Sequence, residues 1–159
     1  MNSRPPADIC RLALSLARES FQSDEVPVGC VICEISEDGA WQVISTGRNR
    51  ILDKRDASAH AELSAISAAC QKKKSERLVN CCLVTTLEPC LMCTGAIVLS
   101  RLEAVWYFAP VAKGIGLCEI LEQARAERRL NHFPFVANLE EFRAESSDLL
   151  AEFFRRKRG

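Results

Sequence analysis

The stretch C-C-L-V-T-T-L-E-P-C-L-M-C (Cys81–Cys93) combines a predicted strand, a sharp break and the start of a predicted helix. Its first seven residues are apolar or β-branched, a pattern that favours a strand buried on both faces of a sheet. Glu88-Pro89 ends this strand, and the apolar run that follows predicts a helix from about Cys90 to Arg101. A buried strand that leads directly into a helix is typical of α/β proteins.

The rest of the chain reads as a strand hairpin followed by alternating helices and strands. Helical spacing of apolar residues predicts further helices over residues 7–21, 60–73 and 117–129, and from 139 to the terminal F-F-R-R-K-R. Apolar runs predict further strands over residues 26–35, 41–46, 104–109 and 133–137, and a polar loop over 47–58. Asp38-Gly39 supplies a hairpin turn between the first two strands. We expect one α/β domain over residues 1–159, with a mixed sheet flanked by helices.

The composition gives no sign of a polyanionic partner or of a membrane. In 159 residues, 21 Lys and Arg balance 21 Asp and Glu, so net charge alone points to no such partner. The start, M-N-S-R-P-P, has no apolar signal-peptide core, and no apolar run approaches the length that spans a bilayer. The sequence therefore predicts a soluble, cytoplasmic protein.

The nine cysteines are many for this length, and their number is odd. Without a secretion signal, buried thiols together with a metal site are a better explanation than a disulfide framework. One C-x-x-C pair, Cys30 and Cys33, lies in a predicted strand, where residues three apart point to opposite faces and cannot readily share an ion. We interpret both as core thiols. Packing roles in strands or helices are also expected for Cys10, Cys70, Cys81, Cys82 and Cys118.

A histidine and two further cysteines are candidates for a metal centre. Cys90 and Cys93 share one face at the start of a predicted helix, where the positive helix end favours thiolates. His60 and Glu62 stand at the start of another predicted helix, in S-A-H-A-E. One imidazole and two thiolates suit zinc and leave a fourth tetrahedral position for water. Two thiolates weaken the acidifying effect of zinc, so the water needs a base, and Glu62 is the candidate.

Two other interpretations of these residues remain open. A structural zinc site with three cysteines would recruit Cys81 or Cys82 and would leave Glu62 without a role. A redox C-x-x-C would have no need of His60. The second histidine, His132, is expected to form a structural hydrogen bond rather than to bind metal.

H-A-E followed by P-C-L-M-C resembles the H-x-E…P-C-x-x-C signature of zinc-dependent cytidine and nucleobase deaminases. The resemblance extends over roughly residues 26–156, and it is most specific to the bacterial tRNA-specific adenosine deaminases. The segments that carry it are V-P-V-G (26–29), G-R-N-R (47–50), A-H-A-E (59–62), T-L-E-P-C-L-M-C-T-G-A-I (86–97), S-R-L (100–102), L-N-H (130–132) and the terminal F-F-R-R.

This resemblance implies a fold, an assembly and a reaction. The implied fold has three layers, α/β/α, around a mixed five-stranded sheet, and the implied assembly is a homodimer. The implied reaction is hydrolytic removal of ammonia from the wobble adenosine of a tRNA anticodon stem-loop, which leaves inosine. The protein would thus be a hydrolase that acts on the C–N bond of an amino-substituted base.

The resemblance also assigns roles to residues of the chain. The ligands of one Zn²⁺ per subunit fall on His60, Cys90 and Cys93, and the proton shuttle falls on Glu62. In the substrate site, Asn49 matches an asparagine that contacts the target nucleoside. The positions that line the base pocket are Val28 and Leu87.

The C-terminal F-F-R-R-K-R suggests a contact with RNA phosphates, because it holds four consecutive cations. We predict nucleic-acid contacts at Phe154, Arg155, Arg156 and Lys157. The alternative is a solvated helix end, whose cations complement the helix dipole and whose phenylalanines pack into the core.

The chain departs from the family pattern at a few positions. Ala57 replaces a usual proline before S-A-H-A-E, and Pro110-Val111 stands where a polar residue is expected near the nucleic acid. These changes leave the metal chemistry intact. They keep open an altered RNA contact, or a deaminase of a free base or nucleoside such as guanine, cytosine or cytidine. A second alternative is a zinc-stabilised binding protein without turnover.

Overall fold

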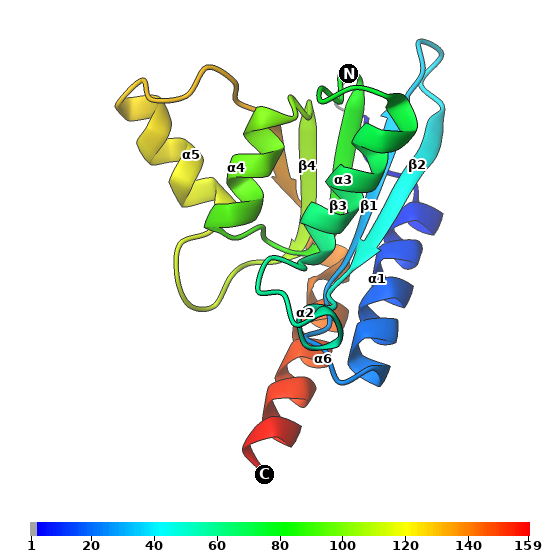
Figure 1. The fold of residues 1–159 in the computed structure, drawn as a ribbon, viewed down its shortest axis with the longest axis vertical. Coiled ribbons are helices and arrows are strands. Elements are labelled where there is room, and N and C mark those ends of the chain that lie inside the picture. The colour runs from blue at the N-terminus through cyan, green and yellow to red at the C-terminus, as the bar shows by residue number, and fades with distance from the viewer. Residues whose placement is uncertain (1–2) are drawn as a thin grey trace.

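The computed structural model describes residues 3–159 and forms one sheet with helices on both faces (Figure 1). Met1 and Asn2, which begin the segment without a signal-peptide core, lie outside the described residues. The strands are β1 (Gly29–Ile35), β2 (Trp41–Arg48), β3 (Cys81–Leu87), β4 (Ala104–Ala109) and β5 (Phe135–Asn138). The helices are α1 (Ala7–Gln22), α2 (Ile51–Lys54), α3 (Ala61–Lys73), α4 (Leu91–Leu99), α5 (Leu117–Ala126) and α6 (Glu140–Arg158).

The sheet has the strand order β2-β1-β3-β4-β5. β1 pairs antiparallel with β2 and with β3, whereas β3, β4 and β5 run parallel to one another. The predicted mixed five-stranded sheet is therefore confirmed. Because β3 and β4 are parallel, the segments that follow them leave the sheet at the same edge.

Two apolar layers bury the two faces of the sheet. α3, α4 and α5 cover one face, and α1 and α6 cover the other. Cys30 belongs to the first layer and Cys33 to the second, which confirms that this C-x-x-C pair cannot hold one ion. Within residues 3–159, no helix combines the length and the hydrophobicity that crossing a membrane requires.

Several predicted boundaries were wrong where the start of β1 pairs with the end of β2. β1 begins at Gly29 rather than at residue 26, since Pro27 has no N–H to donate and the Val28 N–H donates locally to the Val26 carbonyl. β2 continues to residue 48, and the expected loop contains the short helix α2. The Asp53 N–H in the first turn of α2 donates to the Glu25 carboxylate at 2.8 Å. This contact joins residues 28 positions apart, so local sequence patterns do not predict it.

Gly47 allows β2 and α3 to approach closely. A Cβ at this position would lie 2.1 Å from the Ala61 carbonyl oxygen and 2.8 Å from the Ala65 nitrogen, both of which are backbone atoms. We expect Gly47→Ala to lower the free energy of unfolding by about 2–3 kcal/mol, as overpacking does. Urea denaturation measures the change.

Gly95 in α4 provides the matched control. A Cβ there meets no atom within 4 Å, so Gly95→Ala should stabilise the helix by about 0.5–1 kcal/mol. Equal urea midpoints for the two variants would contradict the close approach of β2 and α3.

Candidate metal centre

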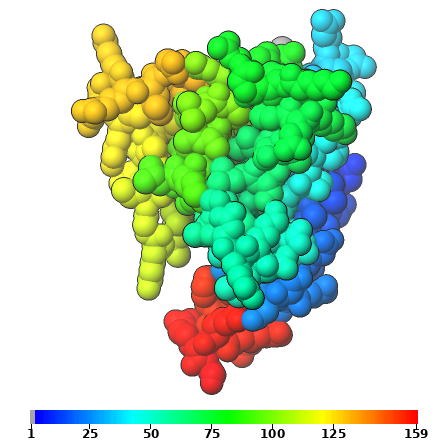
Figure 2. Space-filling view, in the orientation of Figure 1, coloured from blue at the N-terminus to red at the C-terminus, as the bar shows by residue number. Residues whose placement is uncertain are grey.

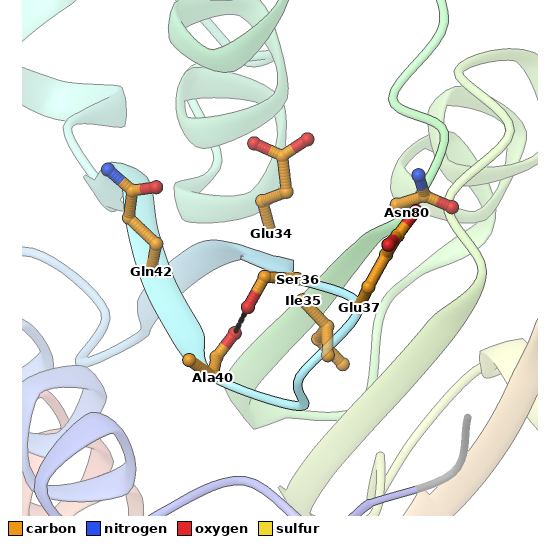
Figure 3. A pocket seen from close by; sticks show the side chains of 7 residues that line it. All are labelled: Glu34, Ile35, Ser36, Glu37, Ala40, Gln42 and Asn80. Carbon is orange, nitrogen blue, oxygen red and sulfur yellow. Dashed lines mark hydrogen bonds between the residues drawn. The ribbon is translucent and has the colours of Figure 1, made fainter.

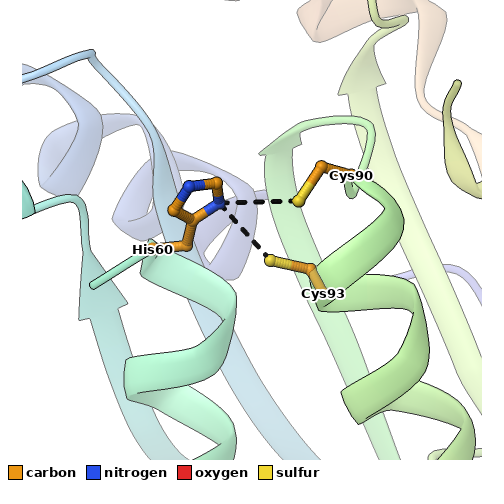
Figure 4. A group of neighbouring side chains, drawn as sticks. All are labelled: His60, Cys90 and Cys93. Atoms are coloured by element: carbon orange, nitrogen blue, oxygen red, sulfur yellow. Dashed lines mark hydrogen bonds between the residues drawn. The ribbon is translucent and has the colours of Figure 1, made fainter. Parts of the chain in front are cut away.

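Two helix N-termini bring together the three predicted metal ligands. His60 is the N-cap of α3 and Cys90 is the N-cap of α4, both with extended backbone. Cys93 lies in the first turn of α4. Neither N-cap side chain makes a capping hydrogen bond, so both can point across the gap between the helices. Figure 4 shows the imidazole of His60 facing both sulfur atoms.

The distances among these side chains fit zinc. His60 Nδ1 lies 3.6 Å from Cys90 Sγ and 3.6 Å from Cys93 Sγ. A tetrahedral zinc ion with ordinary Zn–N and Zn–S bonds places its nitrogen and sulfur ligands about 3.6 Å apart. The donor set therefore suits one zinc ion without rearrangement.

The surroundings of the cluster favour an open site over a closed structural one. Among residues 3–159, no fourth metal-binding side chain joins the group of three. Cys81 and Cys82 lie at the far end of β3 from the residues that lead to Cys90, so the alternative with three cysteines lacks its third thiolate. Cys93 is buried, whereas His60 and Cys90 are only partly buried, which leaves one side of the cluster accessible.

Hydrogen bonding divides the protons unequally among the three groups. Hydrogen bonds from the Cys93 thiol and from His60 lower the pKa of Cys90 to about 3. The same thiol interaction, together with burial, raises the pKa of Cys93. The hydrogen bond to Cys90 raises the pKa of His60. A divalent cation that binds this cluster would displace the protons that its ligands carry.

Glu62 lies in the first turn of α3, buried beside the cluster. Its Oε2 is 3.6 Å from Cys93 Sγ, and its Oε1 accepts a long hydrogen bond of 3.4 Å from the Thr85 hydroxyl. Burial raises the pKa of this carboxyl group. A carboxyl group with a raised pKa next to a metal centre is suited to accept and return a proton.

The three residues predicted to bind substrate lie at the same end of the sheet. Asn49 is buried, and its Oδ1 accepts the N–H of Ala61, the residue between His60 and Glu62, at 2.9 Å. The Asn49 amide nitrogen has no hydrogen-bond partner within residues 3–159, so it can donate to a ligand. Val28 accepts the Asn49 backbone N–H, and Leu87 ends β3 in the same apolar layer.

The second histidine takes a structural role, as predicted. His132 Nε2 donates to the Leu102 carbonyl oxygen at 2.7 Å. Of the cysteines expected to pack, Cys118 is the exception, because it is exposed in the first turn of α5, where its Sγ contacts the Tyr107 hydroxyl. That prediction was wrong because helical spacing alone does not show which side of a short helix faces the sheet.

The basic end of α6 agrees in part with both interpretations of F-F-R-R-K-R, the contact with RNA phosphates and the solvated helix end. Phe153 is buried and packs edge-on against Phe21, whereas Phe154 is 46% exposed. The cations are exposed, and two of them pair with acids: Arg156 with Glu152, and Lys157 with Asp24. In Figure 2 this end projects from the body of the molecule next to the end of α1.

A separate cavity of about 380 Å³ lies away from this centre, under the turn between β1 and β2 (Figure 3). Its lining includes Glu34, Gln42 and Asn80, and no residue of the metal cluster or the predicted base pocket. A larger cavity of about 740 Å³, lined by α5 and residues 134–136, also contains none of these residues, so the clustering of ligands and acid locates the candidate site better than cavity size does.

Sequence reasoning missed the role of Glu88, which it treated only as the end of a strand. The Glu88 side chain is buried, and its carboxylate accepts the backbone N–H groups of Val111 at 3.1 Å and Cys118 at 2.9 Å. A charged residue between a buried strand and a predicted metal ligand was the available signal.

Comparisons with known proteins agree with this geometry. Residues 5–109 match the family model for the cytidine and deoxycytidylate deaminase zinc-binding region. A tRNA-specific adenosine deaminase from Aquifex aeolicus is 36% identical over 153 residues, 93% of each chain. One from Agrobacterium fabrum is 39% identical over 148 residues, 92% of each chain. A solved structure, from studies of A-to-I editing by deaminases at the tRNA wobble position, has a TM-score of 0.80 and 34% identity, and covers 91% of this chain and 100% of its own.

Proposed function

The chain belongs to the deaminase family defined by the cytidine and deoxycytidylate deaminase zinc-binding region, and we propose that it converts adenosine to inosine at the wobble position of a tRNA anticodon. It is a hydrolase that acts on a C–N bond. The observation that carries the proposal is the meeting of His60, Cys90 and Cys93 beside the buried Glu62. The close relatives, which span nearly the whole chain, support the choice of tRNA.

His60, Cys90 and Cys93 hold one zinc ion per chain in this proposal. When bound, zinc acts as a Lewis acid that makes a water molecule nucleophilic near neutral pH. The helix ends contribute as well, because the positive N-termini of α3 and α4 stabilise the thiolates that the site requires.

Glu62 moves the protons of the reaction. Its carboxylate takes a proton from the water that adds to the carbon bearing the amine, and delivers it to the adjacent ring nitrogen. It takes the second proton of that water and gives it to the departing amine, so that the C–N bond breaks and ammonia leaves. The carbonyl of inosine remains and Glu62 returns to its starting state. Burial of the side chain keeps bulk water from competing for these protons.

The base pocket is built from residues around the start of α3. The Asn49 amide nitrogen donates to the nucleoside, while the Asn49 oxygen stays engaged with Ala61. Val28 and Leu87 supply apolar walls. A base that is unstacked in an anticodon loop can enter such a pocket, whereas a base inside a duplex cannot.

The proposal is tested by offering substrates of different size. The protein is incubated with an anticodon stem-loop and, separately, with free guanine, cytosine and adenosine, and ammonia release is measured in each. Release from the stem-loop alone is expected. Release from a free base alone would instead support the small-molecule deaminase left open by Ala57 and Val111.

The end of α6 is proposed to contact RNA phosphates through Phe154, Arg155, Arg156 and Lys157. Arg155 is the cation best placed to do so, because it has no ion-pair partner within residues 3–159. We expect Arg155→Ala to raise the KM for the stem-loop about three- to tenfold. The slope of log KM against log salt concentration should also fall by the amount that one phosphate contact contributes. Steady-state kinetics from 50 to 200 mM salt check both, because one phosphate contact changes KM by roughly threefold over that range.

Arg128 provides a matched control. It is also exposed and has no ion-pair partner in the described part of the chain, but it lies in the turn after α5, at the opposite end of the molecule (Figure 1). Arg128→Ala should leave KM unchanged. Equal salt slopes for wild type and Arg155→Ala would assign the basic end to helix capping alone.

A homodimer is also part of the proposal. α4, which begins at the metal cluster, exposes large apolar side chains along its length, with Leu91 65% and Leu99 79% exposed, together with Met92. Exposed apolar residues grouped in this way suit a contact with another copy of the chain.

We further propose that this activity resides in one domain over residues 1–159 and in the cytoplasm, where its tRNA substrate is found.

A further inference from the structure

Glu88 holds both ends of one loop. The loop covers residues 110–116, between β4 and α5. The Glu88 Oε2 atom accepts the Val111 N–H at 3.1 Å, and its Oε1 atom accepts the Cys118 N–H at 2.9 Å. The Glu88 backbone N–H donates to the Ala109 carbonyl oxygen at 2.8 Å. One buried side chain thus fixes the point where the loop leaves the sheet and the point where it enters α5.

The same loop lies directly against the metal centre. Cys90 and Gly116 form an antiparallel bridge, and the Leu117 N–H donates to the Pro89 carbonyl oxygen at 3.0 Å. A Cβ at Gly116 would lie 2.5 Å from the Glu88 carboxylate, so any other residue here would have to displace that carboxylate. The middle of the loop, residues 112–115, is exposed. The loop is therefore fixed at its ends and free at its tip, next to the partly buried Cys90.

A carboxylate is the side chain that this arrangement requires. Both of its oxygens only accept hydrogen bonds, and each receives one backbone N–H of the loop. A glutamine of the same shape would turn its NH₂ group toward one of these N–H groups. One donor would then be left buried and unpaired, which favours opening of the loop.

We propose that Glu88 is a positioning residue that fixes loop 110–116 beside the metal centre, so that the loop forms part of the surface accepting RNA around the target base. This inference rests on the proposed function for its RNA substrate. A loop ordered in advance costs the substrate no ordering entropy when it binds. Loss of Glu88 should therefore weaken binding of the stem-loop more than it slows the chemical step.

Limited proteolysis tests the attachment of the loop without any substrate. Trypsin cleaves after Lys113 at the exposed tip, and cleavage after Arg128, in the separate exposed turn after α5, serves as internal reference. Glu88→Gln should raise the ratio of the two cleavage rates about tenfold, because an unpaired donor shifts the loop toward open states. Mass spectrometry of the early fragments measures the ratio.

Kinetics and metal analysis test the positioning role. We expect Glu88→Gln to raise the KM for the stem-loop about tenfold, with kcat within about threefold and one zinc ion per chain. Glu122→Gln, which removes an exposed carboxylate of α5, is the matched control and should change none of these. Val111→Pro removes one of the two N–H donors with Glu88 in place, and should give a smaller change in the same direction. It also provides the test if Glu88→Gln does not fold.

The outcomes separate this inference from the proposed function. An unchanged cleavage ratio, or loss of zinc from Glu88→Gln, would overturn the role of Glu88 as the holder of the loop. A kcat that falls while KM is constant would also overturn it. If the wild-type protein releases no ammonia from the stem-loop, the proposed function fails and the RNA-accepting role fails with it, while the cleavage ratio still decides whether Glu88 fixes the loop.

Discussion

Replacing Glu62 with glutamine is expected to lower kcat for the stem-loop by about a thousandfold or more. General acid–base catalysis contributes a rate factor of roughly 10²–10⁴, and this residue both accepts and donates protons. Glutamine keeps the shape of the side chain and can still accept from the Thr85 hydroxyl, but it cannot carry a proton. Zinc should remain at one ion per chain. Single-turnover ammonia release and elemental analysis of the variant measure the two effects.

The chain contains a close control for this change. Glu25 is also buried, and within residues 3–159 its side chain accepts a single hydrogen bond, from the backbone N–H of Asp53, which glutamine can accept as well. Glu25→Gln should retain kcat within a few-fold. If Glu62→Gln turned over as fast as wild type, its proton-transfer role would be refuted. A wild type that binds the stem-loop without turnover, and as tightly as Glu62→Gln does, would instead be a zinc-stabilised binding protein.

The fold was predictable wherever a local pattern matches the final environment. β3 and β4 have the limits that their apolar runs predict, because both strands are buried on both faces and are bounded by polar residues or proline. α2 was missed because its short sequence has no capping signal of its own. It depends on the carboxylate of Glu25, which becomes its neighbour only when α1 and β2 are in place.

The candidate site, too, was predictable where residue type and local pattern suffice, and not where it depends on distant contacts. The chemistry of His60, Cys90 and Cys93 was predictable from residue type and helix position, and the fold supplies the meeting of α3 with α4. The attachments of Glu88 were not predictable, since its two donors lie 23 and 30 residues further along the chain. A sequence does not show which backbone N–H groups will bind a given side chain, because every residue except proline carries such a group.

Replacing Cys90 with serine should abolish zinc binding and activity together. Serine is a favourable N-cap, so the start of α4 keeps its local stability while the thiolate is lost. Zinc content should fall from one ion per chain to near zero. The Tm should fall by about 10 °C, because a ligand present at a thousand times its Kd contributes about 4 kcal/mol and each kcal/mol moves Tm by roughly 2–4 °C. Elemental analysis and thermal unfolding measure the changes.

Cys118→Ser is the control that distinguishes the effect of losing the metal from the effect of losing a thiol. Cys118 is exposed in the first turn of a different helix, so its replacement should leave zinc content, Tm and activity unchanged. Wild-type protein stripped by a chelator should unfold at the same temperature as Cys90→Ser, and zinc should restore the wild type alone. A stripped wild type that unfolds at its original temperature would mean that the three side chains do not use zinc to hold α3 and α4 together. Equal unfolding temperatures in the two metal-free proteins would mean that Cys90 stabilises the fold through the ion rather than through its own packing.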